Sequence, residues 1–370
     1  MGKNITLKQL NESSTYDELY PAGAIDYTML TETTSAAYGV ENGSVKDALT
    51  GLYQYIHNSD VVTIKVVDAS NNPLPNITAN GIIGSPQSGT DGVIKGVANS
   101  NSVTLVSPYV DTIKTKTVDV SKYKNTTRTL IVTMDSVSDG AIVRYTSSQN
   151  VMFSNRVANI DVCCVGGGGA GGVGTNNSHG EGFGGGGGGI VNLISFVVNA
   201  NVSYQINVGS GGTYSGSVAS NSGGSSSFSN YVIANGGGGV IVNASSGGMI
   251  PGKAGADGCG DGGSRSTVAG SNKTISEFND GLIYYSGGGG AASGVIYPSS
   301  SNPKNGGKPN GANGAWFNRN TNKTENATVA GIGGGGGGGI DAQYNSYGRY
   351  GADGSSGGPG LVSIRVHLKS

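Results

Sequence analysis

Five runs of consecutive glycine dominate the second half of this chain, at residues 166–169, 184–189, 236–239, 287–290 and 333–339. Glycine loses more backbone freedom on folding than any other residue, roughly 1–2 kcal/mol or more for each one ordered. The runs must therefore either stay unfolded or gain a dense set of compensating interactions. Strand-like segments adjoin the first three runs, at residues 160–165, 190–194 and 231–234, and a flexible linker would not need them. We therefore predict that the runs are ordered structure.

A glycine run has no side chains to bury, so its backbone must supply the interactions. One solution is a threefold helix like polyproline II, which rises about 3.1 Å per residue and has no internal hydrogen bonds. Its N–H and C=O groups point sideways and can pair with those of neighbouring helices, as buried polar groups must. Collagen would need glycine at every third residue, which this sequence lacks. The remaining alternative is a disordered glycine-rich linker.

Composition excludes several classes of function. Among the 370 residues, 12% are charged and the net charge is −1, so there is no basic surface for nucleic acid or acidic lipid. No apolar segment approaches the roughly 20 residues of a membrane span. The first residues lack the apolar stretch of a secretory signal. We therefore expect a protein that either acts in the cytoplasm or leaves the cell by a route that needs no signal, such as lysis.

Candidate metal, cofactor and catalytic motifs are weak. Cys163 and Cys164 would point to opposite faces of one strand, so we expect buried free thiols and no disulfide between them. The spacing Gly167-x-Gly169-x-x-Gly172 matches a dinucleotide fingerprint, but no helical pattern or acidic residue follows where that motif needs them. Residues 257–263 resemble a single calcium-binding repeat, and that architecture needs several in tandem. We predict no cofactor, no metal and no catalytic residues.

Changes in composition divide the chain into three parts. Residues 1–60 are predicted to be an attachment region, with a short helix at 44–58 that packs against copies of itself or against the next domain. Residues 61–137 contain short predicted strands separated by turns, one of them at 77–83, and this pattern predicts a β-sandwich. Residues 138–370 form the glycine-rich domain, a small sandwich carrying a bundle of polyglycine-II helices with loops. The fold class is therefore mainly β.

Two resemblances to known families follow from these motifs. The pattern Val-x-Asp-x-x-x-x-Pro-Leu-Pro-Asn from Val66, with Thr90-Asp91-Gly92 behind it, resembles carboxypeptidase-regulatory-like sandwich modules. That resemblance implies a spacer or scaffold and no catalytic site.

The second resemblance covers roughly 230 residues of the glycine-rich region. Residues 145–148, 204–209 and 225–228, Val165 with the first run, Asn235 with the third run and the closing residues 358–364 resemble the glycine-rich domain of phage tail-fibre and tail-tip adhesins. Ser154-Asn155-Arg156 stands where that family often has Pro-Ala-Gly, and residues 253–326 are longer than a plain repeat. The resemblance implies that loops between polyglycine helices contact the host surface.

Side chains reappear in the segments between the glycine runs. Aromatic and arginine side chains amid Ser, Gly and Asn are typical of an adaptable recognition surface. The predicted receptor-binding residues are His179, Glu181, Phe183, Tyr284, Tyr285, Tyr297, Trp316, Phe317, Tyr344, Tyr347, Arg349 and Tyr350. The predicted scaffold residues are Gly166, Gly186, Gly237, Gly288 and Gly336. The alternative is that the aromatic residues only close the ends of the glycine bundle.

These observations together predict a receptor-binding protein of a phage tail fibre or phage-tail-like particle. Its expected partners are a host polysaccharide or surface protein and, through residues 1–60, other tail or baseplate proteins, with self-association for example as a homotrimer. Two alternatives remain open: a structural virion or surface protein with no receptor of its own, and an enzyme that degrades envelope polysaccharide. A depolymerase would need two carboxylates facing a groove.

Overall fold

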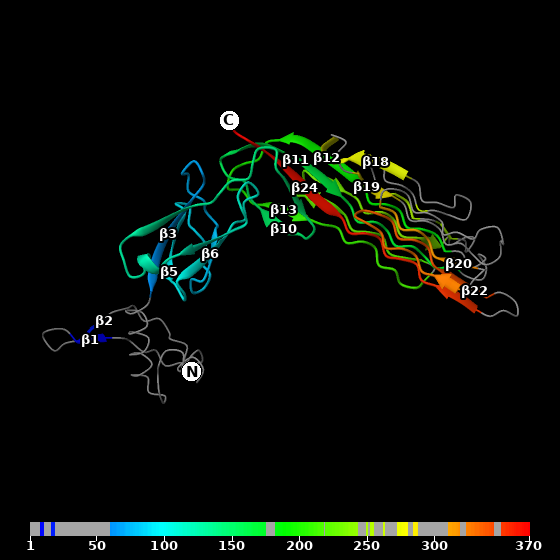
Figure 1. Cartoon of the computed structure of the whole chain (residues 1–370), viewed down its shortest axis with the longest axis horizontal. Coiled ribbons are helices and arrows are strands. Elements are labelled where there is room, and N and C mark those ends of the chain that lie inside the picture. The colour runs from blue at the N-terminus through cyan, green and yellow to red at the C-terminus, as the bar shows by residue number, and fades with distance from the viewer. Residues whose placement is uncertain are drawn as a thin grey trace, which may run out of the picture.

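The computed structural model has a β-sandwich on one side and a long bundle of extended segments on the other (Figure 1). It describes residues 8–10, 16–18, 60–174, 182–217, 219–242, 249–250, 252–254, 262, 272–279, 284–287, 310–318, 323–343 and 349–370. The mainly-β prediction is confirmed, because within these ranges the helical elements are the short 3-10 turns η2 (Ser121–Tyr123) and η4 (Glu277–Asn279). The predicted helix at 44–58 lies outside the described residues. No described helix is long and apolar enough to cross a membrane.

Two three-stranded sheets form the first sandwich. Their orders are β5-β3-β8 and β4-β6-β7, with β3 parallel to β8 and the other pairs antiparallel. The strands are β3 (Val61–Val67), β4 (Thr78–Asn80), β5 (Val93–Val97), β6 (Ser102–Val106), β7 (Thr115–Asp119) and β8 (Thr129–Thr133). Alternation in β3 places Val62, Ile64 and Val66 in the core, each with no exposed surface.

Strand β4 is shorter than the segment 77–83 that the sequence predicts as a strand. Gly81 adopts φ +99°, a left-handed conformation that glycine accepts readily, and the chain turns there. The apolar residues Ile77 and Ile82 are still buried on either side of the short strand. The predicted strand therefore ends early, and Ile83, the last residue of the apolar segment, is 52% exposed.

The base of the glycine-rich region is a second sandwich of two four-stranded sheets. Their orders are β12-β11-β24-β9 and β10-β13-β14-β15. The strands are β9 (Ile142–Tyr145), β10 (Gln149–Val151), β11 (Val157–Val165), β12 (Ile190–Phe196), β13 (Tyr204–Asn207), β14 (Ser226–Phe228), β15 (Val232–Ala234) and β24 (Leu361–Leu368). The last strand, β24, lies between β11 and β9, so the end of the chain completes the middle of this sheet.

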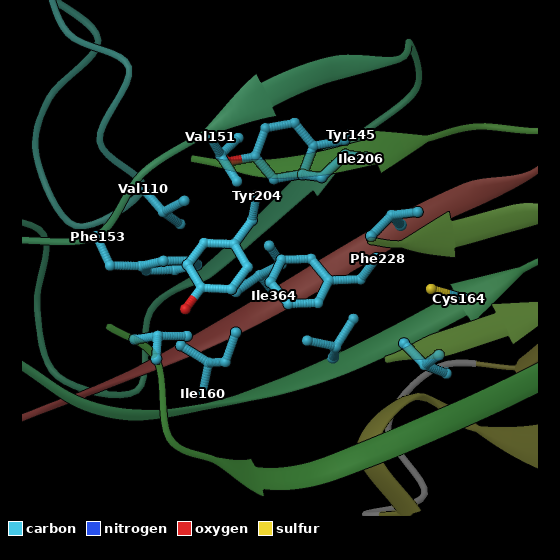
Figure 2. Packing of buried hydrophobic residues seen from close by; sticks show 14 of the residues in the cluster. Val110, Tyr145, Val151, Phe153, Ile160, Cys164, Tyr204, Ile206, Phe228 and Ile364 are labelled. Carbon is cyan, nitrogen blue, oxygen red and sulfur yellow. The ribbon is translucent and has the colours of Figure 1, made fainter. Parts of the chain in front are cut away.

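Aromatic side chains fill the space between these two sheets (Figure 2). The Tyr204 and Phe228 rings stack with centroids 5.3 Å apart, and Phe153 meets Tyr204 edge-on at 5.5 Å. Such offset and edge-on pairs add about 0.5–1.5 kcal/mol to the gain from burial. This dense core holds the ends of the glycine segments that leave the sandwich.

The extended segments run outward from the base sandwich side by side (Figure 1). Green, yellow, orange and red segments alternate in the bundle, so it is assembled from pieces far apart in the sequence. Short hairpins accompany it: β16 (Ile241–Val242) with β17 (Met249–Ile250), β18 (Asn272–Ser276) with β19 (Tyr284–Gly287), β20 (Trp316–Asn318) with β21 (Lys323–Glu325), and β22 (Ile340–Gln343) with β23 (Arg349–Ala352). In the first 60 residues, β1 (Lys8–Leu10) pairs with β2 (Tyr16–Glu18).

Candidate recognition surface

The first glycine run, continued to residue 174, donates its hydrogen bonds to different neighbours in rotation. Successive N–H groups point to three different segments, and the pattern repeats every third residue, as expected of a helix with three residues per turn. The bonds are Gly166 N to Gly189 O (2.9 Å), Gly169 N to Gly186 O (2.8 Å) and Gly172 N to Phe183 O (3.0 Å); Gly167 N to Gly224 O (2.9 Å), Ala170 N to Asn221 O (3.0 Å) and Val173 N to Ser217 O (3.0 Å); Gly168 N to Gly358 O (2.9 Å) and Gly171 N to Ser355 O (3.1 Å).

The carbonyl groups of the same run accept hydrogen bonds from three further segments. These hydrogen bonds run from Gly237 N to Gly167 O (2.8 Å), from Gly212 N to Gly168 O (2.8 Å), from Gly336 N to Gly169 O (2.8 Å) and from Gly339 N to Gly172 O (3.0 Å). Residues 166–174 are therefore a central helix with neighbours on all sides, and we call them the central run. This is the hydrogen-bond pattern expected of packed polyglycine-II helices.

Close approach of the backbones explains why glycine is required. A Cβ added at any of the four described scaffold residues would lie about 2 Å from a backbone oxygen, well inside van der Waals contact. The distances are 2.2 Å at Gly166 (to Asn235 O), 2.0 Å at Gly186 (to Lys253 O), 2.1 Å at Gly237 (to Gly186 O) and 2.0 Å at Gly336 (to Ser355 O). The fifth predicted scaffold residue, Gly288, lies outside the described residues.

The central run also contains the glycines of the dinucleotide-like spacing. Gly167, Gly169 and Gly172 are buried among other backbones, and their N–H groups are already bonded to protein carbonyls. The run is extended up to residue 174 and does not open a helix there. These amides therefore have no capacity left for a pyrophosphate, which agrees with rejecting that motif from the sequence.

Two hairpins lie at the end of the bundle farthest from the sandwich (Figure 1). Strand β20 carries Trp316 and Phe317, and β23 carries Arg349 and Tyr350. Trp316 pairs with Glu325 where β20 meets β21, and Tyr350 pairs with Ala342 where β23 meets β22. Strands β21 and β23 contact each other, so four predicted receptor-binding residues from separate loops share this end of the molecule. We call these two hairpins the distal hairpins.

The hairpin that carries Tyr284 and Tyr285 lies elsewhere. Strands β18 and β19 lie along the flank of the bundle, nearer the base sandwich (Figure 1). The adjoining turn η4 fixes this region to the base sheet: Arg144 Nη2 donates to Glu277 Oε2 at 2.7 Å, and the Arg365 guanidinium lies 4.4 Å from the Phe278 ring centroid. The sequence analysis grouped Tyr284 and Tyr285 with the residues of the distal hairpins as receptor-binding residues. In the structure the two groups lie at different places on the bundle.

Phe183 belongs to the bundle. Its carbonyl accepts the hydrogen bond from Gly172 N, and its side chain is half-buried. Within the described part of the chain, this residue fits the alternative that aromatic residues close the bundle. The other predicted receptor-binding residues, His179, Glu181, Tyr297, Tyr344 and Tyr347, lie outside the described residues.

A polar cluster on the outer face of the base sheet was not predicted from the sequence. Asp161 is 5% exposed; its Oδ2 lies 2.9 Å from His367 Nε2 and 3.7 Å from Arg365 Nη1, and its Oδ1 accepts from Ser195 N at 2.8 Å. The spacing of 206 residues between Asp161 and His367 gives no sequence signal. Because the Asp161 carboxylate accepts a hydrogen bond from the backbone amide of Ser195, the cluster stabilises the irregular edge of β12, where Ser195 has φ +55°.

The two adjacent cysteines are buried and free, as expected. Burial raises the pKa of the Cys164 thiol well above its usual range, so the reactive thiolate is scarce at neutral pH. Among the described residues, no group of three or more His, Cys, Asp or Glu side chains could hold a metal ion.

Comparison with known proteins identifies the second half of the chain. A family model described as a glycine-rich domain matches residues 145–367, which is more than half of the chain. The match spans the base sandwich, the central run and the distal hairpins. No curated protein matches the sequence.

Proposed function

Because this chain belongs to the glycine-rich domain family, we propose that it is a receptor-binding protein of a phage tail fibre or phage-tail-like particle. In this proposal the bundle displays recognition loops to the host cell surface. The observation that carries it is the central run, which is hydrogen-bonded to neighbours on every side and so makes a scaffold that has little freedom to lose on binding.

The position of the distal hairpins supports a binding role for that end of the bundle. They bring Trp316, Phe317, Arg349 and Tyr350 to one end of the molecule, opposite the side where residues 60–137 lie. Tryptophan, tyrosine and arginine dominate the energetics of protein recognition, and aromatic faces stack on sugars. We propose a host polysaccharide or surface protein as the ligand.

The remaining parts of the chain complete the proposal. Residues 61–137 act as a spacer module of the carboxypeptidase-regulatory-like type, and residues 1–60 attach the protein to other tail or baseplate proteins. The protein is then located in the virion tail, carries no catalytic activity, and gains avidity from several copies on one particle. A homotrimer is the self-association that we propose to test.

The experiment uses the purified full-length chain and fractions of bacterial envelope: lipopolysaccharide, cell-wall polysaccharide and detergent-solubilised outer-membrane protein. We expect one fraction to retain the protein, and the double variant Trp316→Ala, Phe317→Ala to bind it at least roughly tenfold more weakly, since hot-spot aromatic residues contribute about 2 kcal/mol or more. Tyr123→Ala, an aromatic change in the sandwich, serves as the matched control and should bind normally.

The other outcomes separate the alternatives. Equal binding by the double variant and the wild type would remove β20 from the site. Retention by no fraction, with a protein that still assembles into particles, would support a structural virion protein without a receptor. Release of soluble sugar from the cell-wall fraction would instead indicate a depolymerase.

A further inference from the structure

The two sandwiches exchange side chains across their boundary. Val110, from the loop between β6 and β7, packs in the aromatic core of the base sandwich beside Phe153 (Figure 2). Met152, which follows β10, packs in the core of the first sandwich with Tyr109. Val110 and Met152 are 1% and 7% exposed. Each core is therefore incomplete without a residue from the other module.

Buried polar groups reinforce this exchange. Asp111 is fully buried, and its carboxylate accepts two hydrogen bonds from Ser154, at 3.0 Å from N and 2.5 Å from Oγ. The Tyr109 hydroxyl lies 2.8 Å from Asn201 Oδ1 and 3.1 Å from Pro75 O. A buried carboxylate without partners is strongly unfavourable, so separating the modules would expose or strand Asp111.

The backbone is joined at the same place. Val110 N donates to Met152 O at 2.9 Å, and Met152 N donates to Pro108 O at 3.0 Å. The connecting segment 136–141 is also held, because Val137 N donates to Asp111 O at 3.0 Å and Gly140 N donates to Val366 O at 2.8 Å. A hinge needs backbone that is free to change its dihedral angles, and these bonds oppose such changes.

We propose that residues 60–137 and the glycine-rich domain form one rigid, cooperatively folding unit, joined by the exchange of Val110 and Met152 and by the Asp111–Ser154 bonds. The first sandwich is then part of the base of the bundle, and it fixes the direction in which the distal hairpins point. Modules joined by a flexible linker would move independently, which is the usual expectation for domains in one chain. This inference does not depend on which ligand the distal hairpins bind.

Amide hydrogen exchange on the full-length chain tests whether Val110 and Met152 couple the two modules. We expect Val110→Ala and Met152→Ala each to lower amide protection at least roughly tenfold in both β3 and β11, because each variant leaves a cavity in the core of the other module. Val197→Ala, a 72% exposed residue of the base sandwich, is the control and should change neither strand. Loss of protection confined to one module in both variants would overturn the proposal.

A second measurement requires no change at the joint. Spin labels at the exposed strand positions Lys95 and Gln205, in a background with Cys259→Ser, report the distance between the first sandwich and the base sandwich. One rigid unit predicts a single narrow distance distribution that is unchanged by viscosity or temperature. A broad distribution in the otherwise unaltered protein would show independent modules and overturn the proposal, even if the Val110 and Met152 variants fail to fold.

Discussion

Gly168 lies in the central run, where an added Cβ would stand 1.9 Å from the backbone oxygen of Gly334. The neighbouring position 170 is alanine and fully buried, so the bundle accepts a methyl group only where a space exists for it. The requirement for glycine at Gly168 is therefore steric, since its φ is not in the left-handed region that favours glycine. Glycine loses much conformational entropy on folding, and the backbone hydrogen bonds compensate for this loss. These bonds form only because the backbones approach so closely.

We predict that Gly168→Ala lowers the free energy of unfolding by about 3 kcal/mol or more, because the backbones must separate and lose mutual hydrogen bonds. Denaturant unfolding measures this loss. The control is Gly224→Ala, where the nearest backbone atom lies 3.1 Å from the added Cβ and a small shift suffices. If the two variants lose the same free energy of unfolding, the packing around the central run is looser than the structure indicates.

Two buried tyrosines differ in whether their hydroxyl has a partner. The Tyr145 hydroxyl is buried without a hydrogen-bond partner, whereas that of Tyr109 lies within bonding distance of Asn201 and Pro75. We predict that Tyr145→Phe leaves stability at pH 7 unchanged or raises it by about 1 kcal/mol, and that Tyr109→Phe lowers it by about 1 kcal/mol. Thermal unfolding of both variants measures these two changes in stability. Destabilisation by Tyr145→Phe would contradict the prediction.

Alkaline pH provides a separate test at the same two residues. Burial raises the pKa of both hydroxyls, with the nearby Asp111 charge adding to the effect at Tyr109. Below about pH 10 both states keep the proton and stability is unaffected; above it the unfolded chain ionises first, so the free energy of unfolding falls by up to about 1.4 kcal/mol per pH unit for each tyrosine. Replacing either residue by Phe should make this decline shallower.

At the scale of elements, the central run and its neighbours differ in how completely they are enclosed. Each N–H group from residue 166 to residue 173 donates to another segment, and those segments in turn cover the run. Opening it requires the surrounding segments to separate, whereas Thr328 and Val329 lie in an exposed outer segment. The order of stability should therefore follow distance from the centre of the bundle and not position in the sequence.

We predict a gradient of amide exchange across the bundle. Amides of residues 166–173 should exchange only through global unfolding, those of 184–189 and 333–339 nearly as slowly, and the amide of Val329 fastest among these. Hydrogen exchange read at single-residue resolution measures the gradient. Exchange at the rate of an unfolded peptide in the glycine runs would mean that they are linkers, as the disordered alternative holds.

At the scale of the whole molecule, the C-terminal segment completes both the base sheet and the bundle. Strand β24 occupies the middle of the base sheet between β11 and β9, and Gly358 O accepts the hydrogen bond from Gly168 N in the central run. Sheet and bundle thus depend on contacts between residues about 200 positions apart. Such long-range pairing makes folding slow, because loops must close before the contacts form.

We predict that a chain ending at residue 359 does not fold its glycine-rich domain, since losing β24 separates β11 from β9 and removes Val362, Ile364 and Val366 from the core. Circular dichroism and size-exclusion chromatography would detect the loss. Removing only Ser370 is the control and should leave the protein folded, because that residue is exposed and lies beyond β24. A folded, compact truncated chain would contradict the assigned sheet order.

The amino-acid sequence alone determined the mainly-β class, the alternating core positions and the packed backbone of the four glycine runs that the structure describes in full, because side-chain periodicity and the lack of a Cβ are local properties. Only the tertiary structure decided which segments surround the central run, that Asp161 meets His367, and that Tyr285 lies away from Trp316. These depend on which backbones pair, and glycine runs of the same composition carry no side chain that could specify a partner. The choice of partner comes from the base sandwich, whose aromatic core and strand order set where each segment begins.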